Sequence, residues 1–225
     1  MKTIKLLIYG AVIITAVLSA CSKNDSTTPA TGSGSTAQTK TLQPDATTGK
    51  DACINSYYPS TNFGSNEDFD ATAWTSGGVF YIARGLLQFD LSSIPTGATV
   101  SSATLSLYND PTAVQTGGQH STLSGSNTAY ISKVNAAWDQ STVTWSNQPT
   151  TSTANQATIP MSTSNNEDYT NLDVTALVAD MVKNPSSNYG MMISLVTEVQ
   201  YRSLVFASSN HSNAAKRPKL VVNYK

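Results

Sequence analysis

Charged residues are scarce in this sequence, and its basic residues form no cluster. Only 12% of the 225 residues are charged, and the formal net charge at pH 7 is −1. A nucleic-acid-binding domain carries a basic patch or stripe along one face, and no such run of lysine and arginine is present. The composition therefore excludes nucleic acid as a partner.

The chain also lacks the motifs that mark common enzyme classes. It has no G-x-S-x-G, H-E-x-x-H or glycine-rich phosphate loop. Glycoside hydrolysis needs two carboxylates across a cleft, but no spacing selects a pair from Glu67, Glu167, Glu198 and the aspartates. His120 and His211 lie in polar loops with no motif around them. We therefore predict that the protein is not an enzyme.

Cysteine is almost absent, and the first of the two cysteines follows a distinctive N-terminal segment. Residues 1–20 begin with lysines at positions 2 and 5 and continue as a short apolar run that ends in small residues. This is the pattern of a secretory signal peptide, and the run is too short for a lasting membrane span. "LSAC" (18–21) resembles the bacterial lipobox, which implies that Cys21 is diacylated and becomes the new N-terminus. An ordinary signal peptide with an incidental cysteine is the alternative.

The remaining cysteine and the segment after Cys21 set the domain organisation. With Cys21 lipidated, Cys53 can form no internal disulfide, and we interpret it as a small packed residue. Residues 22–50 are rich in Ser, Thr, Gly and Pro, which predicts a flexible tether. The start of this tether, "CSKND", resembles the export tags of Bacteroidetes surface lipoproteins. We expect a monomer, lipid-anchored at a bacterial outer membrane or cell surface, with one folded domain over 51–225.

Short strands dominate the predicted domain. Residues 87–91 and 103–107 alternate between apolar and polar, and a Pro/Gly turn lies between them. Strands at this spacing, rich in Thr, Val and Tyr, predict an all-β fold, a jelly-roll β-sandwich. Further strands are expected near 53–57, 70–75, 79–84, 129–135, 142–146, 156–161, 190–196, 203–207 and 219–224.

One segment, residues 173–183, has the periodicity of a helix. Asp173 is a suitable N-cap, and Asn184-Pro185 ends the segment because the residue before proline avoids the helical region. We expect this short amphipathic helix to lie across one end of the sandwich. Its apolar side chains follow the i, i+3, i+4, i+7, i+8 pattern of one buried face: Val174, Leu177, Val178, Met181 and Val182.

Two of the three tryptophans lie in "AAWDQSTVTWSNQP" (136–149). Trp138 and Trp145 are an odd number of residues apart, so in one unbroken strand they would face opposite sides. We predict that they flank a turn made by residues 139–142, whose side chains bond to the backbone. We predict that both rings belong to the core rather than to a sugar-stacking platform.

Six motifs occur in the same order as in DNRLRE domains, which are also classed as carbohydrate-binding module family 96. The resemblance covers 51–225 and implies a jelly-roll sandwich and, less directly, glycan binding. Near "FASSNHSN" (206–213) the chain has Ser209-Asn210 where the family tends to carry an Arg-Glu-like element. The motifs are "YPSTNFG" (58–64), "RGLLQFDLSSIPTGATVSSATLSLY" (84–108), "AAWDQSTVTWSNQP" (136–149), "LDVTALVADMV" (172–182), "NYGMMI" (188–193) and "KRPKLVVNY" (216–224).

Side chains for a glycan contact can be chosen by residue type and strand alternation. Aromatic rings suit the apolar faces of sugars, polar side chains suit hydroxyls, and basic side chains suit the carboxylates of an acidic glycan. With residues 87 and 89 pointing inward, residues 84 and 88 point outward. The predicted carbohydrate-binding residues are Trp74, Arg84, Gln88, Lys133, Tyr201 and Arg202.

A polar loop offers oxygen ligands for a calcium ion. "NFGSNEDFD" (62–70) concentrates acidic and amide side chains, and Ca²⁺ takes six to eight hard oxygens. The spacing is not that of an EF-hand, and a solvated acidic turn is the alternative. The predicted ligands of a structural calcium are Asn62, Asn66, Glu67, Asp68 and Asp70.

These observations favour a surface-anchored, non-catalytic protein that binds a polysaccharide, plausibly an acidic one. Two other readings stay open. A structural or adhesive surface protein would bind a protein partner through a flatter apolar patch. A divergent polysaccharide lyase would need a cleft that brings a Tyr or His together with Arg202 or Arg84.

Overall fold

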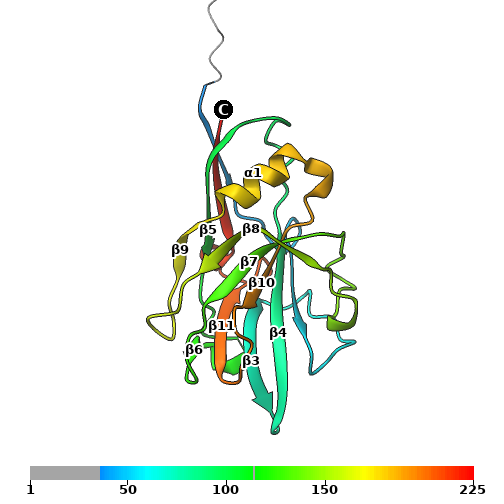
Figure 1. The fold of residues 1–225 in the computed structure, drawn as a ribbon, viewed down its shortest axis with the longest axis vertical. Helices are drawn as coiled ribbons and strands as arrows, with labels where there is room; N and C mark the ends of the chain where they lie inside the picture. Colours follow the sequence, from blue (N-terminus) through cyan, green and yellow to red (C-terminus); the bar gives the residue numbers. More distant parts are fainter. Residues whose placement is uncertain (1–35, 114) are drawn as a thin grey trace, which may run out of the picture. The chain divides into compact units, whose positions relative to one another are not determined.

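Two antiparallel sheets enclose the core in the computed structural model of the protein, which describes residues 36–113 and 115–225 (Figure 1). One sheet has four strands in the order β1-β12-β5-β9. The other has eight, in the order β6-β11-β3-β4-β10-β7-β8, with β2 paired to β4. One α-helix, α1, occurs in these ranges. The predicted all-β sandwich with a short helix is confirmed.

The strands are short and end at turns. Their bounds are β1 Gln38–Leu42, β2 Lys50–Asn55, β3 Asp68–Ser76, β4 Val79–Gln88, β5 Val100–Leu107, β6 Ser121–Thr122, β7 Ala129–Val134, β8 Thr151–Ile159, β9 Tyr169–Asp173, β10 Met191–Leu195, β11 Arg202–Ala207 and β12 Lys219–Tyr224. The helix α1 spans Thr175–Lys183, and single 3₁₀ turns span Gln115–Gly118, Trp145–Asn147, Pro185–Ser187 and Ala214–Lys216.

The long strand β4 pairs with three other strands of the larger sheet. Residues 79–83 pair with β3, residues 83–88 pair with β2, and residues 85–87 pair with β10. Gly85 lies where these ladders meet, and a Cβ atom there would come within 2.4 Å of the Phe69 ring. Only glycine permits this close approach, so Gly85 sets how tightly β3 packs against β4.

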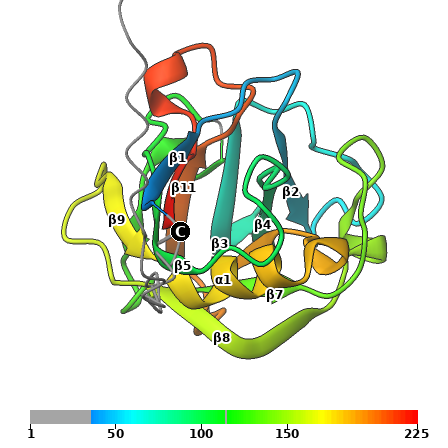
Figure 2. The ribbon, with the colours of Figure 1, turned by 90° about the horizontal axis from the view of Figure 1, so that it is seen from above.

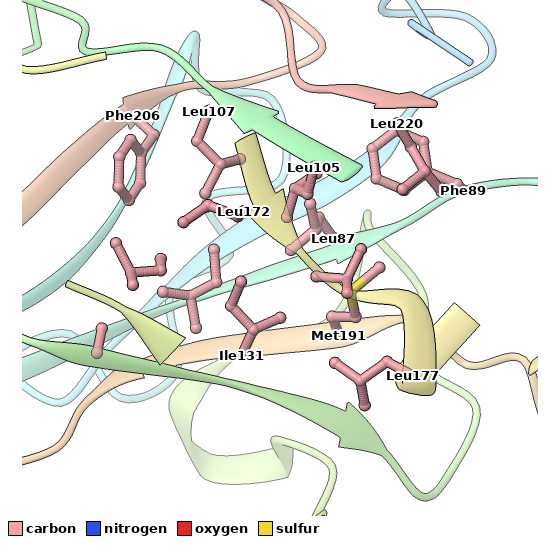
Figure 3. Packing of buried hydrophobic residues seen from close by; sticks show 14 of the residues in the cluster. Leu87, Phe89, Leu105, Leu107, Ile131, Leu172, Leu177, Met191, Phe206 and Leu220 are labelled. Carbon is pink, nitrogen blue, oxygen red and sulfur yellow. The ribbon is translucent and has the colours of Figure 1, made fainter. Parts of the chain in front are cut away.

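The core lies between the two sheets (Figure 3). Leu87, Ile131 and Met191 come from the larger sheet, and Leu105 and Leu220 come from the smaller one. All five are at most 2% exposed. Burying one such side chain contributes about 1.5–3 kcal/mol, so this layer is the main source of stability in a domain that has no internal disulfide among its described residues.

The helix α1 lies across the end of the sandwich near β5 and β8, as predicted (Figures 1 and 2). It begins at Thr175, two residues after the predicted start. The N-cap is Val174 and not the predicted Asp173. The Asp173 carboxylate, one residue before the N-cap, still accepts a hydrogen bond from the backbone N–H of Thr175, 2.9 Å away, and so satisfies one free donor of the first turn. All five apolar residues of the predicted stripe are buried: Val174, Leu177, Val178, Met181 and Val182.

The segment 136–149 forms a corner rather than the strand predicted at 142–146. The Asp139 carboxylate accepts bonds from the backbone and hydroxyl of Ser141, which makes the predicted turn. The Asn147 side chain accepts the backbone N–H of Thr144 and donates to the Thr142 carbonyl, both just before the 3₁₀ turn, so these residues satisfy their own backbone and need no neighbouring strand. Trp138 is buried in a second cluster with Ile54, Leu86, Val143 and Met192, whereas Trp145 is only half-buried.

The folded region starts upstream of the predicted boundary at residue 51. Residues 38–42, which were predicted to belong to the tether, form β1 and pair with residues 220–224 of β12, from Gln38↔Tyr224 to Leu42↔Leu220. Residues 45–49 form a turn closed by the Asp45 carboxylate, which accepts bonds from Thr47 and Thr48. Extended Thr-rich chain can complete a sheet edge even when it buries little, and composition alone does not reveal this.

Residues 1–35 lie outside the described structure. The predicted signal peptide, the lipidation of Cys21 and the first part of the tether all fall there and stay predictions. Among the residues that are described, no helix is both long and apolar enough to cross a membrane.

Candidate functional site

The six predicted binding residues do not form one face. Trp74, Tyr201 and Arg202 meet at the end of the larger sheet opposite α1, where the β3–β4 hairpin, β6 and the start of β11 lie (Figure 1). Arg84 lies further along β4. Gln88 and Lys133 lie toward α1.

The first group forms what we term the Trp74 corner: Trp74, Tyr201, Arg202 and the loop 121–125. The Trp74 and Tyr201 rings make an edge-to-face contact with centroids 5.2 Å apart. Arg202 donates from Nη2 to the Ser124 carbonyl at 2.9 Å, which ties β11 to the loop. Tyr201 has φ of 69°, a left-handed conformation that costs a non-glycine residue energy. Such strain persists only where surrounding contacts fix it, and it concentrates at functional sites.

A hollow of about 380 Å³ opens beside Trp74. Its lining is polar except for Trp74 and Leu123, and the Leu123 side chain is 76% exposed. A half-buried indole ring and an exposed aliphatic side chain around hydroxyl and amide groups suit a ligand that is apolar on its faces and polar at its edges. The other lining residues are Gln119, His120, Ser121, Thr122 and Asn165.

His120 in this hollow serves the fold and not proton transfer. Its Nδ1 accepts the backbone N–H of Val205 at 3.0 Å, so Nε2 carries the proton and donates to the Glu167 carbonyl at 2.9 Å. The ring is 1% exposed, and this burial lowers the pKa of His120 because the charged form loses its hydration. The neutral imidazole is held by two hydrogen bonds, and it connects β11 to the loop that contains Glu167.

Arg84 is already saturated by protein partners. Its guanidinium makes two bonds of 2.8 and 2.9 Å to the Glu198 carboxylate and a third of 2.9 Å to Gln148. It also lies 4.8 Å from the centre of the Trp145 ring. Glu198 belongs to the loop 196–201 that leads into Tyr201, so Arg84 holds the loop that positions one ring of the Trp74 corner.

The side chains of Lys133 and Gln88 are engaged by α1 and by the segment that follows it, residues 185–188. The Lys133 ammonium pairs with Asp180 of the helix and donates to Ser187, and its side chain is 17% exposed. The Gln88 amide donates to the Asn188 carbonyl at 2.6 Å, while its Oε1 is buried and meets no partner among the described residues. Lys133 therefore fastens the helix to β7, whereas Gln88 keeps an unused acceptor.

The five predicted calcium ligands do not converge on one point. The Asn62 amide donates to the carbonyls of Gln140 and Val143, and Glu67 accepts from Ser212. Asp70 is fully buried and accepts from the Cys53 thiol at 2.8 Å. Within the described ranges, no group of three or more His, Cys, Asp or Glu side chains is arranged to hold a metal ion. The residues present therefore do not fit the predicted ion.

Two acids near Cys53, the buried Asp70 and the half-buried Asp68, have perturbed pKa values. Burial raises the pKa of Asp70, and burial together with the carboxylates of Asp70 and Asp110 raises the pKa of Asp68 to about 6. Perturbed carboxyls are frequent in active sites. Here Asp70 has no exposed surface, so it cannot meet a substrate. We interpret this cluster as structural.

The Ser209-Asn210 segment, where the chain departs from the DNRLRE pattern, binds its neighbours within the fold. Buried Ser209 donates its N–H to the Asp51 carboxylate at 2.8 Å. The Asn210 amide donates to the carbonyls of Gly64 and Asn66, both at 3.1 Å. The segment therefore anchors the loop 62–66 through backbone contacts.

Sequence reasoning missed the loop 121–125, which supplies half of the Trp74 corner. The segment is a Gly/Ser-rich stretch without periodicity, so nothing in it predicts a contact with β11. Its one usable signal is Leu123, a large apolar residue among small polar ones.

Comparisons with known proteins identify a family. Residues 43–224 match the family described as Carbohydrate-binding module family 96. No curated protein matches the chain.

Proposed function

The chain belongs to carbohydrate-binding module family 96, and on this premise we propose that it binds a polysaccharide at the Trp74 corner without cleaving it. The observation that carries the proposal is the contact between the half-buried Trp74 ring and the exposed Tyr201 ring beside an open polar hollow. Two rings at an angle offer apolar surface to a sugar, and the hydroxyls of the loop 121–125 offer hydrogen bonds.

The proposed ligand is an acidic polysaccharide. Arg202 uses Nε and Nη2 to bond to Ser124, and its Nη1 meets no hydrogen-bond partner among the described residues. A guanidinium fixed in this way is preorganised for a carboxylate or sulfate.

The proposed absence of catalysis is supported by the positions of the three glutamates. Glu198 is bound to Arg84, Glu167 accepts bonds from Thr163, and Glu67 accepts from Ser212. No two of them share a partner, whereas glycoside hydrolysis needs two carboxyl groups facing one bond.

We also propose that the domain is held at the outer membrane or cell surface by a diacylated Cys21 and that it is monomeric. A lipid anchor keeps a captured polysaccharide near the membrane and raises its effective concentration. In membrane fractionation, Cys21→Ser should release the protein and Cys53→Ser should not. Retention of Cys21→Ser in the membrane fraction would contradict the anchor, and light scattering tests the monomer.

A protein-binding role is the second candidate, because apolar side chains are exposed near the same end of the sheet. Val79 and Phe80 lie on the β3–β4 hairpin, and Val199 lies on the loop before Tyr201. Exposed apolar patches mark protein-interaction sites. Retention by a protein partner without retention by any polysaccharide would favour this role.

Affinity electrophoresis of the full chain through gels containing neutral or acidic polysaccharides tests the main proposal. At least one acidic polysaccharide should retard the wild type. Trp74→Ala and Tyr201→Ala should weaken that retardation about tenfold, equivalent to about 1.4 kcal/mol. Tyr58→Ala removes a more exposed ring on the loop between β2 and β3 and serves as the control. No retardation by any polysaccharide would refute the binding role, and release of sugar products would refute the absence of catalysis.

A further inference from the structure

Lys50, the first residue of β2, is a half-buried cation without a counterion. Its ammonium makes no hydrogen bond or ion pair with any residue in the described ranges, and it lies 4.5 Å from the centre of the Trp138 ring. By contrast, Lys133 and Lys216 are paired with Asp180 and Asp168. Partial burial of a charge without a partner costs free energy, which a bound anion would recover.

Two hollows adjoin at Lys50. One, of about 540 Å³, lies between the end of β4, the loop that follows it and the C-terminal part of α1, and it has an apolar floor that includes Leu91 and Met181. The other, of about 620 Å³, is lined by the turns around Gly49, Gly64 and Gln140, whose residues are mostly polar and include one acid, Asp139. Lys50 is the residue that both linings share, so its ammonium is accessible from two sides.

Gln88 places an unused acceptor beside this cation. Lys50 and Gln88 are directly opposite each other in the β2–β4 ladder, so their side chains leave the sheet on the same side, with Cβ atoms about 5 Å apart. Gln88 lines the 540 Å³ hollow, and its buried Oε1 lacks a donor within the described structure. A buried acceptor without a donor is costly, and a ligand hydroxyl is a suitable donor.

The acids near Lys50 are engaged elsewhere. The Asp139 carboxylate accepts the backbone N–H and hydroxyl of Ser141 and forms no ion pair with Lys50, although its charge partly opposes the lowering of the Lys50 pKa by burial. Asp90, on the rim of the smaller hollow, is exposed and accepts the backbone N–H of Ser92. The positive charge of Lys50 is therefore available to a ligand.

We propose that Lys50 and Gln88 form a second sugar-binding site, in which the Lys50 ammonium binds the anionic group of a sugar ring and Gln88 Oε1 accepts a hydrogen bond from a ring hydroxyl. The anionic group is a carboxylate or a sulfate. The site rests on the proposed function for its biological ligand. It is separate from the Trp74 corner, because the eight residues of β4 from the Trp74 partner Tyr81 to Gln88 span about 23 Å at about 3.3 Å per step.

Titration of the ¹⁵N-labelled full chain with sodium glucuronate, glucose 6-sulfate and glucose tests this site. The reporter is the indole N–H of Trp138, which donates to the Tyr189 carbonyl at 2.8 Å beneath the Lys50 ammonium. At least one anionic sugar should shift this signal, and glucose should shift it at least tenfold less at equal concentration. The better of the two anionic probes identifies the group as carboxylate or sulfate.

Variants separate the site from a general charge effect. Lys50→Met should weaken the response to the anionic sugar at least tenfold, and Lys50→Arg should keep it because the charge remains. Lys219→Met, on β12 in the other sheet, removes the same charge and should change nothing. An unchanged response in Lys50→Met, an equal loss in Lys219→Met, or equal shifts by glucose and glucuronate would overturn the proposal.

The two proposals fail in different ways. Trp74→Ala should weaken retardation by the polysaccharide about tenfold and keep the Trp138 response to the anionic sugar. A wild type that no polysaccharide retards but that responds to glucuronate through Lys50 would refute the proposed function and leave the anion site standing. Retardation without any response at Trp138 would refute the second site alone.

Discussion

At the scale of single residues, Tyr201 combines a strained backbone with a ring in the proposed site. Its φ of 69° is readily adopted by glycine but not by alanine. Tyr201→Gly and Tyr201→Ala should both weaken polysaccharide retardation about tenfold, because both remove the ring. In urea unfolding, however, Tyr201→Gly should be about 1 kcal/mol more stable than Tyr201→Ala. Equal stabilities would show that the left-handed conformation is not maintained in solution.

Asp68 makes stability depend on pH. Its pKa is raised from 3.8 to about 6 in the folded protein, mainly by burial and then by the carboxylates of Asp70 and Asp110. As pH rises, the Asp68 carboxyl therefore loses its proton in the unfolded state before it does so in the folded state. The free energy of unfolding falls as a result between about pH 4 and 6. Asp68→Asn should be more stable than the wild type by about 2 kcal/mol at pH 7.5, and the gain should vanish near pH 4.

The comparison with Asp68→Asn is needed because other groups titrate in the same range. Burial lowers the pKa of His120, so this histidine destabilises the folded state as pH falls below 6.5. Taking the difference between variant and wild type at each pH cancels the His120 contribution. A difference that stays constant from pH 4 to 7.5 would contradict the raised pKa of Asp68.

At the scale of elements, β1 lies outside the stretch that matches the family. The family match begins at residue 43, directly after β1 ends at Leu42. β1 pairs with β12 along its whole length and contributes Leu42 to the edge of the core. A chain that begins at residue 43 should have a free energy of unfolding about 1–3 kcal/mol lower than a chain that begins at residue 36. Urea denaturation measures this difference. Equal free energies of unfolding would mean that β1 does not pair stably with β12.

The ion pair between β7 and α1 gives Lys133 a structural role. Lys133→Met should lower the free energy of unfolding by about 1 kcal/mol, because it leaves the partly buried Asp180 carboxylate unpaired. Asp180→Asn should cost less in the Lys133→Met background than in the wild type, and this double-mutant cycle measures the pair. Polysaccharide retention should stay unchanged in Lys133→Met. Loss of retention in this variant would show that Lys133 contributes to polysaccharide binding.

At the scale of the whole molecule, patterns within one segment were predictable and contacts between segments were not. The alternation of apolar and polar residues predicted β4 and β5, and the helical spacing of apolar residues predicted the buried face of α1. The Thr-Val-Thr-Trp pattern at 142–145 favours a strand, yet Asp139 and Asn147 satisfy that backbone locally and form a corner. Sequence alternation does not reveal such competing side-chain bonds.

The candidate site shows the same limit. Alternation correctly places Arg84 and Gln88 on the same side of β4, but the partner that engages Arg84, Glu198, lies 114 residues further along the chain. Lys50 was assigned to the tether by composition and so was not considered as a ligand. Residue type therefore predicted which side chains suit a glycan, while the pairing of distant loops decided which of them remain available.

The placement of β1 has a mechanical consequence. β1 lies at the end of the domain near α1, and the Trp74 corner lies at the opposite end (Figure 1). A pull between the N-terminal segment and a ligand held at that corner would run along the axis of β1. Such a load shears the β1–β12 hydrogen bonds all at once instead of peeling them apart one by one. The force at which the edge strand β1 detaches would therefore be set by the whole β1–β12 ladder and not by its weakest single bond.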